Sequence, residues 1–187
     1  MDRLIFSLKR AWQWLAKRPL QFVLLRIYAQ IARRVTGAPL RRYSQITPLL
    51  HIGGQHYRQG IAEMRARGIS AVVNLRREYD DEAAGVALDH YLHLPVRDNT
   101  APALEHLEAG VEFISRHINQ GRGVYVHCGV GVGRAPTLAA AYLVSTGLTS
   151  DEAWATLRAV RPFIWPNRRQ RRVVADFAQE PQLWPAS

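Results

Sequence analysis

The stretch that decides the fold of this chain is Val124-Tyr125-Val126-His127-Cys128-Gly129-Val130-Gly131-Val132-Gly133-Arg134-Ala135-Pro136-Thr137. Its first residues are apolar and predict a short buried strand over 124–127, and the Ala- and Leu-rich run that follows predicts a helix over 134–146. Between them lie the only cysteine of the chain and three alternating glycines. A glycine-rich turn between a strand and a helix start points backbone N–H groups inward, and the helix dipole adds positive potential. The stretch therefore predicts an anion-binding loop.

Two side chains of this loop carry chemistry. A thiol among inward N–H groups and positive potential ionises readily, so Cys128 is predicted to be a nucleophile that attacks phosphorus. Arg134 supplies a planar fork for two phosphate oxygens. The alternative is that Cys128 is a small packed hydrophobic residue, as most buried cysteines are, but this leaves the flanking loop without a purpose. The residues predicted to bind the phosphate are Gly129, Val130, Gly131, Val132, Gly133 and Arg134.

The spacing of His127, Cys128 and Arg134 resembles the His-Cys-x5-Arg motif of the cysteine-dependent phosphatases, specifically of the small dual-specificity branch. The resemblance covers residues 43–180. It implies an α/β domain with a mostly parallel central sheet flanked by helices, and hydrolysis through a phosphocysteine intermediate without metal or cofactor. The segment 74–80, with Glu78 and Tyr79, resembles the members that dephosphorylate phosphatidylglycerophosphate. The segment 161–170 resembles the run before the family's final helix.

A departing oxygen needs a proton, which a carboxylic acid on a mobile loop can supply. Asp98 lies in a polar loop after the strand predicted over 91–96, thirty residues before Cys128, and it matches the acid of the family's loop. The alternative is that Asp98 only caps a turn. Asp89 is a weaker candidate because it precedes the same strand. His127 is expected to face away from Cys128 and to support the loop by hydrogen bonding, without carrying the proton.

The chain departs from the family at Ala135, where Ser or Thr is usual. In the family that hydroxyl steadies the thiolate as it leaves in the second step, although glucan phosphatases also carry Arg-Ala-Pro. Thr137 is two residues further on and lies on the wrong helix face to substitute for it. The step that this departure affects is hydrolysis of the phosphoenzyme.

The composition restricts the function further. A chain of 187 residues suits one domain with an appendage, and a single cysteine excludes an internal disulfide and a cysteine-based zinc site. Its two lysines, Lys9 and Lys17, lie far from any glycine loop, which excludes a Walker-type nucleotide site. Of the net charge of +10, residues 1–44 carry +9, because they contain ten Lys and Arg and one acid. The remainder is nearly neutral, so nucleic acid is not expected as a partner.

Residues 1–42 alternate apolar and basic side chains, and we expect a basic amphipathic helical segment. The longest uncharged stretch, Pro19–Leu25, is far shorter than the ~20 residues that span a bilayer. The pattern predicts interfacial helices on an anionic membrane, with Trp12, Trp14 and Phe22 at headgroup depth. A helix packed on the domain, an organellar transit peptide and a membrane span remain alternatives. A linker is expected at 36–39, dividing the chain into the segment 1–42, a catalytic domain over 43–180 and a tail over 181–187.

The remaining elements follow from hydrophobic periodicity. The predicted strands cover 49–52, 71–75, 91–96 and 124–127, and the predicted helices cover 56–67, 102–119, 134–146, 150–160 and 167–179. Val130 and Val132 stand where loops for polyphosphorylated inositols carry lysines, so a single terminal phosphate is favoured. The expected substrate is a phospholipid monoester such as phosphatidylglycerophosphate. The alternatives are a phosphoprotein, a phosphoglucan and a non-catalytic phosphate-binding module. The expected location is cytoplasmic and peripheral on the membrane, or mitochondrial in a eukaryote.

Overall fold

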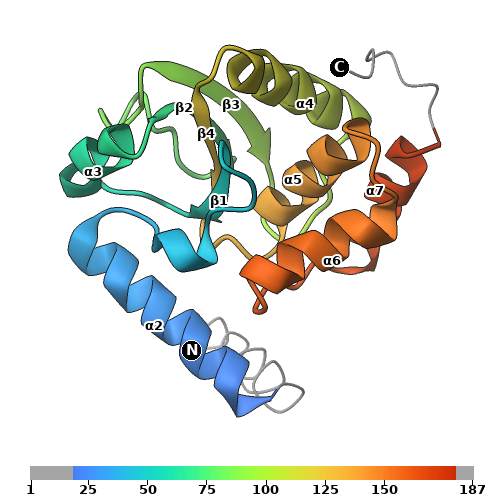
Figure 1. Ribbon diagram of the computed structural model, residues 1–187, viewed down its shortest axis with the longest axis horizontal. Helices are drawn as coiled ribbons and strands as arrows, with labels where there is room; N and C mark the ends of the chain where they lie inside the picture. The colour runs from blue at the N-terminus through green and yellow to red at the C-terminus, as the bar shows by residue number, and fades with distance from the viewer. Residues whose placement is uncertain (1–18, 180–187) are drawn as a thin grey trace.

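The computed structural model describes residues 19–179 and is built on a four-stranded sheet in which every strand pair is parallel (Figure 1). In sheet order the strands are β1 (Leu50–Gly54), β4 (Gly123–Cys128), β2 (Ile69–Arg76) and β3 (His90–Val96). The predicted α/β class with a mostly parallel sheet is therefore confirmed. Because all strands run the same way, their carboxyl ends meet at one edge, where α/β proteins bind ligands. The predictions for Trp12, Trp14 and the tail at 181–187 lie outside the described residues.

Helices cover the sheet on both sides (Figure 1). They are α2 (Leu20–Thr36), α3 (Ile61–Ala66), α4 (Leu104–Asn119), α5 (Arg134–Ser145), α6 (Ser150–Val160) and α7 (Arg168–Phe177). Residues 134–144 of α5 are all buried, because this helix packs against the sheet and also against α4, α6 and α7. Its composition of Ala, Leu and Val suits a helix with no exposed face. The helix that leaves the cysteine loop is thereby fixed from every side.

The helix predicted over 56–67 is shorter than expected. The structure has a 3-10 turn over Arg58–Gly60, and α3 begins at Ile61. The reason is a close backbone contact: a Cβ on Gly60 would lie 2.1 Å from the carbonyl carbon of Gly37. His56 lies before the helix, with Nε2 2.6 Å from the carbonyl oxygen of Val86. Neither constraint is visible in local periodicity.

Helix α2 packs on the body through one face and exposes the other. Val23, Ala29 and Arg33 are buried on the inner face. Gly37 ends the helix in the left-handed region (φ 78°), and the following Ala38 is buried, so the predicted linker at 36–39 is a tight turn into the body. The large apolar side chains that remain 49 to 74% exposed are Leu20, Leu24, Ile27, Tyr28, Ile31 and Val35. We call these six residues the outer face of α2.

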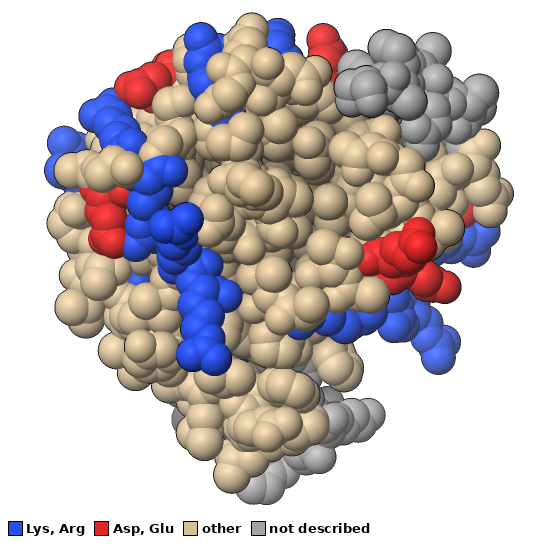
Figure 2. Space-filling model, in the orientation of Figure 1, with Lys and Arg blue, Asp and Glu red and all other residues tan. Residues whose placement is uncertain are grey.

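This arrangement agrees with the predicted amphipathic helix over its described part. Figure 2 shows that the surface over α2, at the bottom of the view, is formed mainly by uncharged side chains. Among residues 19–179, no helix has both the length and the hydropathy needed to cross a bilayer. The division of the chain at residue 42 stays a prediction.

Candidate active site

The cysteine loop lies at the carboxyl edge of the sheet. β4 is an interior strand between β1 and β2, it ends at Cys128, and α5 starts at Arg134, so the predicted strand–loop–helix unit is present. Cys128 is 3% exposed, and the backbone N–H of Gly131 donates to its Sγ at 3.3 Å. Gly131 has a φ of 71°, and a Cβ there would lie 2.3 Å from the carbonyl carbon of Gly53. Only glycine fits this position, because both the backbone angle and the available space exclude a side chain.

The loop carbonyls are held from outside. Four successive carbonyl oxygens, from residues 129 to 132, accept hydrogen bonds from groups outside the loop. The donors are Gln55 N to Gly129 (3.2 Å), Arg161 Nη2 to Val130 (3.1 Å), Arg161 Nε to Gly131 (2.8 Å) and Trp165 N to Val132 (2.6 Å). With the carbonyls turned outward, the backbone N–H groups are free to face the thiol side, where an anion would bind. This loop geometry is the one that the sequence predicts, and anion binding by it stays a prediction.

Arg161 is a site residue that the sequence analysis missed. It is 6% exposed, and besides the two loop carbonyls it donates from Nη1 to the carbonyl oxygen of Tyr43 at 2.7 Å. Burial lowers the pKa of Arg161 to about 10, which leaves the guanidinium charged at neutral pH. A buried cation with three backbone acceptors fixes the back of the loop. The segment 161–170 resembles the run before the family's final helix. No local pattern in it predicts the contact of Arg161 with the loop, thirty residues earlier.

Arg134 is fixed before any substrate binds. Its guanidinium donates to both carboxylate oxygens of Glu78, at 3.0 and 3.1 Å, and to the carbonyls of Leu75 and Val96, at 3.1 and 2.8 Å. Burial opposes ionisation of Glu78, but hydrogen bonds from Arg134 and Arg76 lower its pKa to about 2. Burial likewise acts to lower the pKa of Arg134, but the Glu78 bond and the neighbouring negative charges raise it above its usual value. Glu78 therefore orients Arg134, the side chain that is predicted to bind the phosphate. The sequence alone assigned no role to Glu78.

Asp98 lies where the predicted acid should be. It follows β3, its side chain is 68% exposed, and its Oδ1 is 3.0 Å from Arg134 Nη2. The next residues are tied to α7, since Asn167 Nδ2 donates to the carbonyl of Asn99 and Gln170 Nε2 to that of Thr100, both at 2.9 Å. The structure thus brings Asp98, Arg134 and the cysteine loop together. Their catalytic roles stay predictions.

Two other carboxylates, those of Asp89 and Asp81, lie in positions that do not suit the role predicted for Asp98. Asp89 precedes β3, at the opposite edge of the sheet, where it pairs with Arg65 at 2.6 Å. Asp81 is fully buried behind the loop. Only Asp98 among these three combines exposure with a contact to Arg134, so it is the one able to reach a leaving group.

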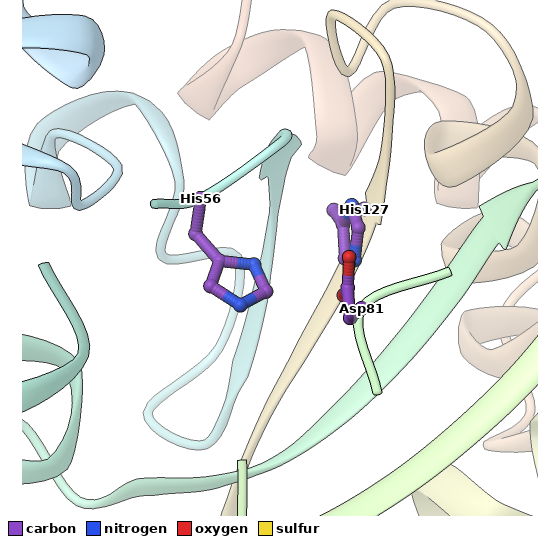
Figure 3. A group of neighbouring side chains, drawn as sticks. All are labelled: His56, Asp81 and His127. Carbon is purple, nitrogen blue, oxygen red and sulfur yellow. The ribbon is translucent and has the colours of Figure 1, made fainter. Parts of the chain in front are cut away.

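His127 is fully buried, and its hydrogen bond goes to Asp81, with Nε2 2.6 Å from Oδ2. The sequence predicts that His127 hydrogen-bonds near the loop. Its partner in the structure, Asp81, comes instead from the turn after β2. Figure 3 shows His56 completing this group, with its ring perpendicular to that of His127 at a centroid distance of 5.1 Å. Neither His56 Nδ1 nor His127 Nδ1 has a hydrogen-bond partner among residues 19–179.

His56, Asp81 and His127 have ligand atoms within 4.8 Å of one another, a spacing at which a metal ion could be considered. The geometry does not fit. The 2.6 Å separation of His127 and Asp81 is a hydrogen bond, whereas neighbouring ligands of a tetrahedral zinc ion are about 3.3 Å apart. A metal must also lie in the plane of each imidazole ring, but the edge of His56 faces the flat side of His127 (Figure 3). The group is therefore best described as a buried hydrogen-bonded cluster.

A cavity of about 350 Å³ lies between the start of α2, α6 and the segment before α7, and no residue of the cysteine loop lines it. One of its lining residues, Trp165, is bonded through its backbone N–H to the loop carbonyl of Val132. Its lining combines apolar and basic side chains, including Phe22, Ile164, Trp165, Arg158, Arg168 and Arg171. Such a lining suits a ligand with both an apolar part and negative charge.

A comparison with protein families adds to this geometry. The model of the dual specificity phosphatase catalytic domain matches residues 50–180. This chain belongs to the dual specificity phosphatase family. The resemblance drawn from the cysteine loop is thereby confirmed.

Individual relatives within this family give further comparisons. Phosphatidylglycerophosphate phosphatase PTPMT2 of Arabidopsis thaliana is 28% identical over 145 residues, which are 74% of this chain and 64% of that protein. PTPMT1 of the same plant is 25% identical over 181 residues, or 93% and 53%. Dual specificity protein phosphatase 2 of Mus musculus is 32% identical over 125 residues, or 66% and 39%. The chain thus spans about half to two thirds of the length of the two plant relatives.

Solved structures agree with the assignment of the fold. The structure of PTPMT1 in complex with PI(5)P matches with a TM-score of 0.68 at 23% identity, over 73% of this chain and 94% of that chain. Tk-PTP in the active form matches with a TM-score of 0.65 at 29% identity, over 73% and 96%. The first comparison supports the fold alone, since its identity is low.

Proposed function

We propose that this dual specificity phosphatase family member hydrolyses a phospholipid monoester such as phosphatidylglycerophosphate at an anionic membrane surface. In the first step the Cys128 thiolate attacks phosphorus, and a phosphorus–sulfur bond forms as the phosphorus–oxygen bond breaks. Asp98 gives its proton to the departing alkoxide oxygen, and Arg134 with the loop N–H groups binds the phosphate oxygens. The alcohol product then leaves.

In the second step water attacks the phosphocysteine, and Asp98, now ionised, takes the proton from that water. Inorganic phosphate and the thiolate are released. Ala135 is fully buried and has no hydroxyl, and the hydroxyl of Thr137 donates to the carbonyl of Gly133 at 2.9 Å, away from the sulfur. The backbone N–H of Gly131 donates to the sulfur, and under this proposal it stabilises the thiolate as negative charge returns to it.

The lipid substrate rests on one observation, the placement of α2. Arg33 on its inner face donates to the carbonyl of Gln55, and the N–H of Gln55 donates to the first loop carbonyl, that of Gly129. The outer face of α2 is therefore held at a fixed position relative to the cysteine loop. An apolar helix face beside arginines suits the headgroup region of an anionic membrane, and the apolar and basic cavity between α2 and the segment before α7 suits an amphiphile. The similarity to PTPMT2 supports the same substrate.

A phosphoprotein substrate is the second candidate. It is favoured by the 32% identity to dual specificity protein phosphatase 2, which is higher than the identity to either plant lipid phosphatase. The lipid proposal includes a cytoplasmic location, peripheral on the membrane. Under the protein proposal the outer face of α2 would have no role in catalysis.

The two candidates can be separated by assaying three substrates. Phosphatidylglycerophosphate in anionic vesicles, a phosphotyrosine peptide and a soluble aryl phosphate are each given to the wild type and to the double variant Leu24→Asp/Ile31→Asp. Both residues are more than half exposed, so folding should be preserved. We expect the double variant to lose at least about tenfold in vesicle hydrolysis, because each apolar side chain buried in lipid contributes roughly 1.5–3 kcal/mol. Its aryl phosphate activity should stay within about twofold.

The matched control is Ala109→Asp, an equally exposed apolar-to-acidic change on α4, at the other side of the molecule (Figure 1). It should leave all three activities unchanged. A double variant with full activity on vesicles would contradict a membrane role for α2. A higher kcat/KM for the peptide than for the lipid would favour the phosphoprotein candidate, and the Cys128→Ser variant supplies the blank for each assay.

A further inference from the structure

A continuous chain of hydrogen-bonded side chains runs behind the cysteine loop and joins its two ends. We call these residues the Asp81 network: His127, Asp81, Gln55, Arg76, Glu78 and Arg134. The successive contacts are His127 Nε2 to Asp81 Oδ2 (2.6 Å), Gln55 Nε2 to Asp81 Oδ1 (2.8 Å), Arg76 Nη1 to Gln55 Oε1 (2.9 Å), Arg76 Nε to Glu78 Oε1 (3.0 Å) and Arg134 Nη2 to Glu78 Oε1 (3.1 Å). One end of the network is His127, the residue before Cys128. The other end is Arg134, the last residue of the phosphate-binding loop.

Asp81 is the charged centre of this network and has no contact with solvent. Burial opposes its ionisation, but the hydrogen bond from His127, that histidine's charge interaction and the bond from Gln55 lower its pKa below the usual value. Both carboxylate oxygens are therefore acceptors. Because a buried carboxylate is costly unless it is fully bonded, its two partners must stay in place for the folded state to keep it.

The first partner, His127, is held in one orientation. The Asp81 carboxylate can only accept, so Nε2 of His127 carries the hydrogen of this bond. The ring of His127 lies nearly parallel to Tyr125, at a centroid distance of 5.7 Å, and the edge of His56 packs against its flat side. Burial first, then the charge of His127, lowers the pKa of His56 to about 4, so His56 is neutral. Since His56 is neutral, Asp81, in the turn after β2, is the charged group that faces His127.

The second partner, Gln55, connects Asp81 to the loop by two routes. Its backbone N–H donates to the first loop carbonyl, that of Gly129, at 3.2 Å. Its side-chain oxygen accepts from Arg76, which orients Glu78 and through it Arg134. A change at Asp81 that moves Gln55 would therefore displace the first loop carbonyl as well as the guanidinium that binds phosphate.

We propose that Asp81 is a positioning residue: its buried carboxylate keeps His127 and Arg134, at opposite ends of the cysteine loop, in the arrangement needed for attack. Asp81 touches neither the substrate nor the sulfur. The proposal rests on the phosphatase reaction proposed above but not on its lipid substrate. A displacement of about 1 Å at a reacting group can cost on the order of a hundredfold in rate, which sets the size of the effect to be sought.

The test is the variant Asp81→Asn, assayed with an aryl phosphate and by alkylation of Cys128 with iodoacetate. Asparagine keeps the size of the side chain but removes its charge and cannot accept from both His127 and Gln55. Either one of these bonds breaks, or the ring hydrogen of His127 moves from Nε2 to Nδ1, which has no partner among residues 19–179. We expect kcat to fall about tenfold to a hundredfold and the alkylation rate of Cys128 to change with it. Both are measured well below the melting temperature of the variant, so that loss of folded protein cannot produce the effect.

The matched control is Asp80→Asn, in the same turn. The Asp80 side chain is 42% exposed and accepts from Tyr91, which meets Asp81 only through the Asp81 backbone N–H and bonds no side chain of the Asp81 network. It should keep both readouts within about twofold of the wild type. An Asp81→Asn variant that also stays within twofold while folded, or a control that loses as much, would overturn the proposal.

A second variant, Gln55→Met, removes the bonds of the Gln55 side chain to both Arg76 and Asp81 but keeps the Asp81 carboxylate and its bond to His127, and it serves where Asp81→Asn fails to fold. We expect a smaller loss of the same kind. In the double variant the loss should equal the larger single loss, because both residues act through one network, whereas independent effects would multiply. Multiplied losses, or an unchanged Gln55→Met variant, would overturn the proposal. If the wild type hydrolyses no aryl phosphate, the proposed function fails, and the alkylation rates still decide the role of Asp81.

Discussion

Two carboxylates compete for Arg134, and their geometry separates their roles. Glu78 accepts two hydrogen bonds from the guanidinium, whereas Asp98 makes one contact from a side chain that is 68% exposed. The doubly bonded carboxylate is the harder to displace. We therefore expect Glu78 to stay with Arg134 when phosphate binds, and Asp98 to be the group that moves to the leaving oxygen.

The Asp98→Asn variant should lose more activity on a substrate with a poor leaving group than on one with a good leaving group. An alkyl phosphate needs a proton on its departing oxygen, so its rate should fall about 10²–10⁴-fold, whereas an activated aryl phosphate should lose much less. Steady-state rates on the two substrates test this. Equal losses on both would show that Asp98 acts only as a partner of Arg134.

At the scale of elements, the segment between α6 and α7 holds the cysteine loop through hydrogen bonds to the backbone carbonyls of the loop. Arg161 begins this segment and donates to the carbonyls of Val130 and Gly131, and Trp165 donates to that of Val132. The same segment ends in a capping box, in which the side chains of Asn167 and Gln170 bond each other's backbone N–H. α7 is therefore anchored at the point where it also meets the Asp98 loop.

Replacing Arg161 with lysine should lower kcat/KM for an aryl phosphate by about tenfold to a hundredfold. A lysine keeps the charge but lacks the planar fork, so it cannot bond two successive carbonyls and that of Tyr43 together. Initial-rate kinetics at a temperature where the variant is folded would measure the loss. The control Arg158→Lys, an exposed change one turn earlier in α6, should have no effect on this substrate. An active Arg161→Lys variant would mean that the loop holds its shape without these bonds.

At the scale of the whole molecule, burial puts histidines where they cannot accept a proton. His51 and His56 are 2% and 1% exposed, and burial lowers the pKa of each to about 4. The charges of Arg67 and Arg41 add to the effect on His51. Both residues adjoin or belong to β1, at one edge of the sheet, so protonation of either would disturb the packing of the body.

The free energy of unfolding should therefore fall as the pH drops from 6.5 towards 4. In this window the unfolded chain binds protons at these histidines and the folded protein does not, so acid favours unfolding by up to roughly 1.4 kcal/mol per pH unit for each. Urea titrations at several pH values would measure the slope. His51→Leu should remove about a third of it, since His56 and His117, whose pKa burial also lowers to about 4, remain. A wild type equally stable at pH 6.5 and 5 would contradict this account.

The amino-acid sequence by itself determined the cysteine loop and the elements around it. The strand, the loop and the helix of residues 124–145 are contiguous, so their geometry depends on local propensities and glycine positions. The long amphipathic or apolar runs, such as α4 and α5, were likewise predicted to within about two residues, because their periodicity is a local property. The acid loop at Asp98 could be predicted because it ends a strand that was itself recognisable.

Only the tertiary structure decided what surrounds the loop. Gln55, Glu78, Asp81 and Arg161 meet the loop because the packed sheet brings distant segments to one edge, and contacts across 30 to 74 positions leave no periodic signal. The late start of α3 and the tight turn after α2 arise from one such contact, that of Gly60 with Gly37. The physical reason is that a hydrogen bond between distant residues depends on strand order and register, which are properties of the packed sheet.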